Sequence, residues 1–253
     1  MKKILMLLVV CMSSFVFKAQ RPAADRFETS KGDLIIQPIK HATSVLTWNK
    51  KVIYIDPYGG AKAFEGLAAP DLIIITDMHP DHLSAETLAT IICDKAQLLV
   101  PQAVADLLPE KLKNKAVILA NGKTMELLGI SISAIAMYNL PEVADSKHPK
   151  GRGNGYVLEM GGKRIYFSGD TEDISEMRDL KNIDVAFVCM NLPYTMTIEQ
   201  AASAVSAFKP KIVYPFHYRG QDGFSDVEAF KKLVNSSDPK IEVRLRNWYP
   251  EYN

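Results

Sequence analysis

The chain has 253 residues, of which 47% are hydrophobic and 23% charged, a balance typical of a folded protein with a substantial apolar core. Its 30 basic and 29 acidic side chains are nearly balanced, which argues against a nucleic-acid partner, because the phosphate backbone binds clustered positive charge. Three cysteines do not form a disulfide framework, and we expect Cys93 and Cys189, both in apolar surroundings, to be buried free thiols.

The first residues are typical of an export signal. Two lysines near the start precede an apolar run that ends at Val16, and a small residue follows at Ala19. We therefore expect residues 1–19 to be a secretory signal peptide and residues 20–253 to form a single domain, periplasmic or secreted. Signal removal takes away three lysines and no acidic residue, which leaves a net charge of −2. No stable membrane insertion is expected afterwards, because no later stretch is apolar for long enough to span a bilayer.

Short β-type runs alternate with turns in the first part of the chain. After a polar lead-in over residues 21–33, strands are predicted over residues 34–39, 44–48 and 52–55. Because no crossover helix separates them, these strands predict an antiparallel start. The rhythm then changes to an apolar strand, a helix with helical spacing of apolar residues and a short strand, over residues 72–76, 84–93 and 98–100.

The second half continues with strands and helices in alternation. Further strands are predicted over residues 130–134, 156–160, 164–167, 185–189 and 211–214. Helices are predicted over residues 174–180, 198–208 and 226–234, the last with Ser225 as N-cap. Many strands in both halves with helices between them predict an α+β fold in four layers, an αββα sandwich.

The most informative segment is Thr76-Asp77-Met78-His79-Pro80-Asp81-His82, which lies between a predicted strand and a predicted helix. Four of its side chains are possible metal ligands, and the proline stiffens the turn that carries them. The histidines of the chain all lie at strand ends or in polar loops: His41, His79, His82, His148 and His217. Asp170, in a Gly-Asp-Thr turn, also follows directly on a predicted strand. Side chains delivered from several strand ends can converge on one ion.

Each of these features also has a purely structural explanation. The segment 77–82 can cap the following helix, and Gly-Asp-Thr is a common turn composition. His148 lies in a polar stretch where a solvated histidine is ordinary. The simultaneous presence of all of them favours the metal site.

Together these motifs resemble the metallo-β-lactamase superfamily, nearest its branch of L-ascorbate-6-phosphate lactonase-like and N-acyl-phosphatidylethanolamine phospholipase D-like hydrolases. The resemblance covers nearly the whole mature chain, and the family's motifs match, in order, Asp56, residues 77–82, His148, Asp170 and His217. Residues 40–43 and 215–218 are also similar to that branch. The resemblance implies a hydrolase in which bound metal activates water.

Roles are carried over from the family residue by residue. The resemblance implies that His79 and His148 hold one metal ion, that Asp170 bridges, and that the other ion is held by Asp81, His82 and His217. Asp81 and Asp170 would also act in catalysis by orienting the activated water. Asp56 would support the ligands by hydrogen bonds without touching metal.

The chain departs from the family at Asp77, where the His-x-His-x-Asp-His pattern has its first histidine. A carboxylate can still be a metal ligand and is a harder donor than imidazole, so this change favours iron or manganese more than the usual pattern does, or weakens the first site. We expect one or two divalent metal ions, with zinc as the first choice and manganese or iron as alternatives.

The substrate is less defined than the chemistry, because this fold serves several substrate classes through loop variation. We expect a small molecule, namely a lactone, an ester or a phosphodiester. Candidate substrate-binding residues are His41, Tyr194, Tyr218 and Arg219; a structural role for His41 and surface positions for the others are the alternatives. The sequence carries no signal for the oligomeric state.

Three other functions are compatible with the same residues. One is a non-catalytic metal-binding or sensory periplasmic protein of this fold, in which Asp77 has dismantled one site. Another is a β-lactam hydrolase, which the form of the histidine cluster does not favour. The last is redox chemistry at bound iron.

Overall fold

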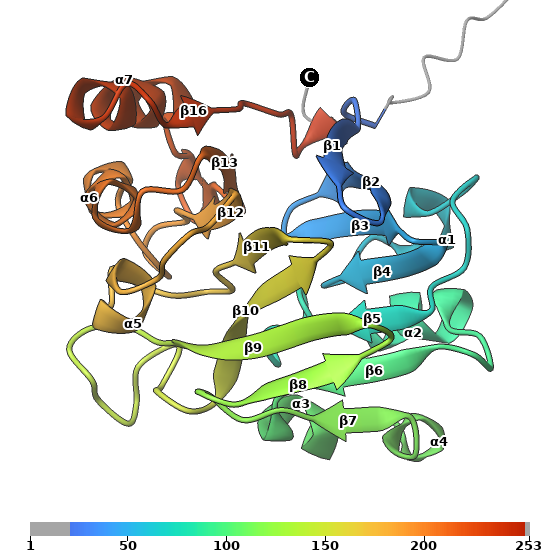
Figure 1. Ribbon diagram of the computed structural model, residues 1–253. Helices are drawn as coiled ribbons and strands as arrows, with labels where there is room; N and C mark the ends of the chain where they lie inside the picture. Colours follow the sequence, from blue (N-terminus) through green and yellow to red (C-terminus); the bar gives the residue numbers. More distant parts are fainter. Residues whose placement is uncertain (1–20, 251–253) are drawn as a thin grey trace, which may run out of the picture.

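Two seven-stranded sheets, one from each half of the chain, face each other in the computed structural model, which describes residues 21–250 (Figure 1). The first sheet follows chain order: β1 (Asp25–Thr29), β2 (Gly32–Lys40), β3 (Thr43–Trp48), β4 (Lys51–Ile55), β5 (Leu72–Ile74), β6 (Gln97–Val100) and β7 (Ala116–Ile118). The predicted signal peptide, residues 1–19, lies outside the described residues.

The second sheet has the order β16-β13-β12-β11-β10-β9-β8. Its strands are β8 (Thr124–Leu127), β9 (Ile130–Met137), β10 (Gly153–Met160), β11 (Lys163–Phe167), β12 (Val185–Cys189), β13 (Ile212–Phe216) and β16 (Glu242–Val243). A separate short hairpin joins β14 (Arg219–Gly220) and β15 (Gly223–Phe224).

Both sheets change from antiparallel to parallel pairing in the same way. Strands β1 to β4 are antiparallel and β4 to β7 are parallel. Likewise β8 to β11 are antiparallel, and β11, β12, β13 and β16 are parallel. The carboxyl ends of neighbouring parallel strands meet at one edge of a sheet, which is where such folds collect polar side chains.

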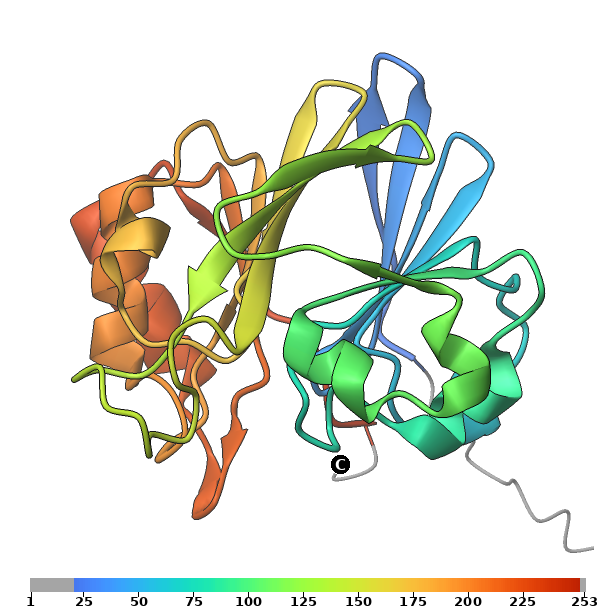
Figure 2. The ribbon, with the colours of Figure 1, turned by 90° about the horizontal axis from the view of Figure 1, so that it is seen from below.

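Helices cover the outer face of each sheet. The first sheet carries α1 (Gly60–Ala63), α2 (Ala85–Ile91), α3 (Gln102–Leu107) and α4 (Glu110–Lys113). The second carries α5 (Ser175–Arg178), α6 (Ile198–Phe208) and α7 (Val227–Ser237). Figure 2 shows the resulting order of helices, sheet, sheet and helices, which confirms the predicted four-layer sandwich.

The residues of β5 show how the layers are held together. Leu72 and Ile74 are fully buried in the larger apolar cluster, which lies between the sheets and continues beneath α6 and α7. Ile73 and Ile75 point the other way, into a second cluster beneath α2 to α4. A strand buried on both faces needs a continuous apolar run, which is why the sequence predicted a strand over residues 72–76.

Several predicted details were wrong. The polar lead-in over residues 21–33 contains β1, an edge strand whose alternately exposed residues give a weak apolar signal. The N-cap of α7 is Asp226, whose carboxylate accepts from the backbone of Ala229 at 2.9 Å, whereas the hydroxyl of Ser225 donates to a loop carbonyl. Strands β7 and β8 and helices α3 and α4 were not predicted.

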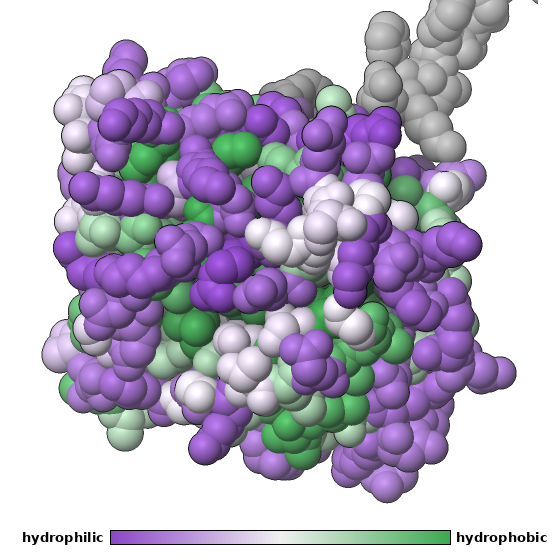
Figure 3. All heavy atoms as spheres, viewed as in Figure 1, coloured by the Kyte–Doolittle hydropathy of each residue, from purple (hydrophilic) through white to green (hydrophobic). Residues whose placement is uncertain are grey.

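The prediction of two buried free thiols is confirmed for one of the two cysteines. Cys189 is a buried free thiol, whereas Cys93 is free but only partly buried. None of the helices in residues 21–250 is long and apolar enough to cross a membrane. Hydrophilic residues cover most of the face in Figure 3, and hydrophobic ones gather in its lower part, where β7 and β8 lie in Figure 1.

Replacing Phe187 by alanine should lower the free energy of unfolding by about 3–5 kcal/mol, because a large cavity would remain in the second sheet. The ring is fully buried and stacks on Phe167 and Tyr214 of the neighbouring strands, with centroid distances of 4.5 and 4.8 Å. Urea denaturation measures the change. Leu107→Ala, at a residue 53% exposed, is the control and should stay within about 0.5 kcal/mol of the parent; equal losses in both variants would contradict the prediction.

Candidate metal centre

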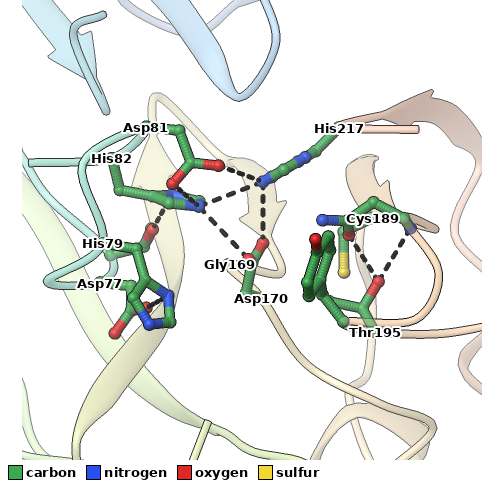
Figure 4. A network of polar contacts seen from close by, with 12 residues as sticks. Asp77, His79, Asp81, His82, Gly169, Asp170, Cys189, Thr195 and His217 are labelled. Carbon is green, nitrogen blue, oxygen red and sulfur yellow. Dashed lines mark hydrogen bonds and ion pairs between the residues drawn. The ribbon is translucent and has the colours of Figure 1, made fainter. Parts of the chain in front are cut away.

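Four loops deliver histidine and aspartate side chains to one place, and Figure 4 labels the side chains from three of them. The loop after β5 carries Asp77, His79, Asp81 and His82. The other contributions are His148 from the β9–β10 connection, Asp170 from the loop after β11 and His217 directly after β13. All of the predicted ligand residues therefore come together, although they are spread over most of the chain.

The centre of the cluster is the buried carboxylate of Asp170, which is surrounded by imidazole rings. Its Oδ2 lies 3.4 Å from Nε2 of His82 and 3.3 Å from Nε2 of His148, and its Oδ1 lies 3.2 Å from Nε2 of His217. The two nitrogens of His82 and His217 are themselves 3.2 Å apart. One group of ligand atoms able to hold a metal ion is formed by His82, Asp170 and His217.

Asp56 determines which nitrogen of His82 is available to the cluster. Its carboxylate accepts hydrogen bonds from the backbone and hydroxyl of Thr76, at 2.7 and 2.6 Å, and lies 2.9 Å from Nδ1 of His82. Since a carboxylate only accepts, Nδ1 of His82 carries the proton in the neutral ring and Nε2 presents a lone pair. Asp56 thus holds both the loop and the ring in position.

Three buried atoms of the cluster have no hydrogen-bond partner among the described residues. They are Nε2 of His148, Oδ1 of Asp170 and Nδ1 of His217. Nδ1 of His148 lies 3.1 Å from Oδ1 of Asn139, an acceptor, so Nε2 is the lone-pair side of that ring as well. Unpaired acceptors in a buried place are costly unless a cation meets them, and the donor set therefore fits a divalent metal ion.

The electrostatics of the cluster point the same way. Burial opposes charge on His82, but the carboxylates of Asp170, Asp56 and Asp81 outweigh it and raise the pKa of His82 well above its usual value. Burial likewise opposes ionisation of Asp170, yet His217 and His82 hold the pKa of this carboxyl well below its usual range. A proton on His82 and a metal ion therefore compete for the same electron pair, so binding of metal at this position releases protons.

A second group comprises Asp77, His79 and His148, whose ligand atoms also lie close enough together for a metal ion. Oδ2 of the fully buried Asp77 is 2.7 Å from Nδ1 of His79 and 3.8 Å from Nε2 of His148. The same carboxylate is held by Arg152, with Nε 3.3 Å from Oδ1 and Nη2 3.0 Å from Oδ2. Sequence reasoning missed Arg152, because an arginine between two glycines in a polar loop carries no signal of what it faces.

His41 lies at the outer edge of the cluster and completes a third group with Asp81 and His217. Burial and the electrostatic influence of the neighbouring His217 lower the pKa of His41 to about 4, so the His41 ring is neutral at neutral pH. Nε2 then donates to Oδ2 of Asp81 at 3.0 Å, and Nδ1 accepts from the hydroxyl of Tyr249 at 2.8 Å. His41 therefore orients the carboxylate of Asp81.

Three of the residues that surround the cluster have left-handed backbone conformations. The φ angles of His41, Asp56 and His217 are 55°, 42° and 45°. This conformation is uncommon outside glycine and is more frequent for aspartate and histidine than for most residues. Each residue directly follows a strand, so the sharp change of direction turns its side chain toward the site.

A cavity of about 470 Å³ opens beside Asp81 and His41. Its wall includes Lys40, Tyr194 and Arg219. Of the predicted substrate-binding residues, His41, Tyr194 and Arg219 thus line this cavity.

Tyr218 lies elsewhere. Only 9% of this residue is exposed, its hydroxyl donates to the carbonyl of Arg246 at 3.3 Å, and its ring packs edge-on against Tyr249. Sequence reasoning placed Tyr218 with the substrate because it follows the end of a predicted strand, but the turn after β13 directs it into the protein.

Comparisons with known proteins agree with this geometry. The model of the beta-lactamase superfamily domain matches residues 36–217. A UPF0173 metal-dependent hydrolase of Pyrococcus abyssi is 32% identical over 215 residues, which make up 81% of this chain and 93% of the relative. A crystal structure of a protein provisionally named a metal-dependent hydrolase, from Parabacteroides distasonis, is 36% identical with a TM-score of 0.78 and covers 89% of this chain and 98% of that one.

A more distant structure shares the fold. Igni18, a metallo hydrolase from Ignicoccus hospitalis, is 22% identical with a TM-score of 0.70 and covers 84% of this chain and 94% of that one. The chain thus belongs to the β-lactamase superfamily, whose metallo-hydrolase fold it has. It is a metal-dependent hydrolase with a cluster of histidines and aspartates able to bind metal.

Replacing Asp56 by asparagine should weaken zinc binding about 10- to 100-fold, because the charged acceptor that fixes the His82 ring is lost. Competition with a chromophoric chelator measures the affinity. Asp71→Asn is the matched control: Asp71 also accepts from a backbone amide, that of Val52 at 2.9 Å, but at the opposite end of β5. Equal zinc affinity in both variants and the parent would show that Asp56 does not support the site.

Proposed function

We propose that the protein hydrolyses a small lactone, ester or phosphodiester at a centre built on His82, Asp170 and His217, with Asp81 beside them. The observation that carries the proposal is the convergence of buried imidazole nitrogens from His82, His148 and His217 on the carboxylate of Asp170. Zinc is our first choice of metal, because imidazole suits it and two of the three residues of this centre are histidines. Asp77, His79 and His148 form the second candidate position.

Bound metal lowers the pKa of water to about 7 and polarises the oxygen of the bond under attack. The residues of the chain supply the rest of the chemistry. Asp170 and Asp81 accept hydrogen bonds from the attacking water and so orient it. His41 keeps Asp81 in place, because its neutral ring donates to Oδ2 of that carboxylate.

The cavity beside Asp81 is the proposed substrate site. Asp81 is 36% exposed there, whereas Asp170 is nearly buried, so the substrate reaches the centre from the Asp81 side. Lys40 and Arg219 place positive charge on the wall, which favours a substrate with a negatively charged group. The aromatic ring of Tyr194 provides a surface for its apolar part.

We also propose that the protein belongs to the lactonase-like and phospholipase D-like branch and that it is periplasmic or secreted. The likeness of residues 40–43 and 215–218 to the lactonase-like and phospholipase D-like branch supports a lactone or phosphodiester over a β-lactam. The basic and apolar start of the chain supports a periplasmic or secreted protein.

His82→Ala and Asp170→Ala should each abolish hydrolysis and reduce bound metal, because both remove an atom at the centre of the cluster. The protein is purified without added metal, analysed for its elements and assayed against esters, lactones and phosphodiesters. His41→Ala is the control that should keep its metal, because its ring contacts Asp81 and Tyr249 from the outer edge. Full metal content in the first two variants would refute their assignment as ligands.

Arg219→Gln should raise KM for anionic substrates about tenfold and leave KM for neutral esters nearly unchanged, because a positive charge is removed from the cavity wall. Steady-state kinetics on a matched pair of charged and neutral esters measures the difference. Arg164→Gln is the control, since Arg164 is bound to Glu159 on the strand pair β10–β11. An equal change for both esters would argue against recognition of an anion.

A further inference from the structure

Asp77 forms a bidentate ion pair with Arg152. The guanidinium of Arg152 binds both carboxylate oxygens, with Nε at 3.3 Å and Nη2 at 3.0 Å. Oδ2 receives a further hydrogen bond from Nδ1 of His79 at 2.7 Å. Such a two-point pair is the strongest geometry between arginine and a carboxylate, and here the carboxylate is fully buried.

The same guanidinium also engages His79. With Nδ1 donating to Asp77, the lone pair of the His79 ring lies on Nε2, and Nη2 of Arg152 is 3.4 Å from that atom. Asp77 and His79, two of the three possible ligands of this group, thus already contact Arg152. Only His148 keeps an unpaired nitrogen, and that atom lies closer to Asp170, at 3.3 Å, than to Asp77, at 3.8 Å.

The charge of Arg152 is permanent, because a guanidinium is not deprotonated in proteins. A divalent ion bound to Asp77 and His79 would lie within a few ångströms of it, in a place that is largely buried. Coulomb repulsion at such a distance and low dielectric is large. The guanidinium of Arg152 therefore neutralises the charge of Asp77 and also repels a metal ion at this position.

The other half of the cluster has a different electrostatic environment. Within residues 21–250, the ion pairs of Asp170 and Asp81 join them only to imidazole rings. A neutral imidazole offers a lone pair to a metal ion, whereas a guanidinium has none to offer. This side of the cluster therefore presents electron pairs without a fixed positive charge beside them.

We propose that Arg152 takes the place of a second metal ion, so that the protein binds a single ion on the side of His82, Asp170 and His217. The inference rests on the proposed metal centre and specifies its occupancy. Asp77 then serves as the partner that positions Arg152, and the guanidinium keeps a fixed positive charge beside the reaction site without a second metal.

The test is a count of metal ions per chain. Full-length protein freed of metal is titrated with Zn(II) alone, and native mass spectrometry and elemental analysis give the stoichiometry. We expect one zinc ion in the parent and two in Arg152→Gln, which frees Asp77 and His79. Asp77→His with Arg152→Gln should also bind two ions and leaves no buried charge unpaired, so it serves if the single variant does not fold.

Arg164→Gln is the matched control and should bind one ion, because Arg164 pairs with Glu159 away from the cluster. Two ions in the parent would overturn the inference while leaving the proposed metal centre intact. If both Arg152 variants fold and bind one ion or none, the inference is also overturned, because Arg152 would then not be the group that prevents a second ion from binding. A parent without any zinc would instead contradict the metal centre itself.

Discussion

The centre of this protein depends on one buried carboxylate that is shared by three imidazole rings. Asp170 lies within 3.4 Å of nitrogens from His82, His148 and His217, which come from three different loops. A charged group in such a place is stable only if positive charge meets it, and the rings alone leave Oδ1 of Asp170 and Nε2 of His148 unpaired. The donor set of this arrangement therefore fits a divalent metal ion.

The two sheets explain why these loops meet. In each sheet antiparallel strands give way to parallel ones, at β4 in the first and at β11 in the second. Asp56 directly follows β4 and Asp170 lies in the loop after β11, so the two carboxylates leave their sheets at corresponding points. Packing of the sheets through one apolar cluster brings these two edges together. The hydrophobic core and the polar site are thus consequences of the same topology.

Charge distribution then divides the site into two unequal halves. On one side, the ion pairs that Asp170 and Asp81 form within residues 21–250 join them only to imidazole rings. On the other side Asp77 faces Arg152, whose charge does not change. Asp77 stands where the family pattern has a histidine. Its hardness as a donor alone would favour iron or manganese at this position, but its carboxylate is already paired with the guanidinium of Arg152.

Much of the fold could be read from local patterns. Buried strands such as β5 and β12 have continuous apolar runs, and helix α6 has the bounds predicted for it, residues 198–208. The edge strand β1 was missed because it is alternately exposed and lies in polar sequence. Local signals report burial, and they fail where an element is stabilised by its neighbour rather than by its own apolar side chains.

By itself the sequence determined the layered fold and the set of histidines and aspartates at strand ends, because both follow from periodicity and short motifs. Only the tertiary structure decided which side chains face one another: that Arg152 binds Asp77, that His41 holds Asp81 and that Tyr218 turns away from the cavity. The physical reason is that these contacts join residues more than 25 positions apart. Their distances depend on how the sheets pack, and no local pattern of residues encodes that.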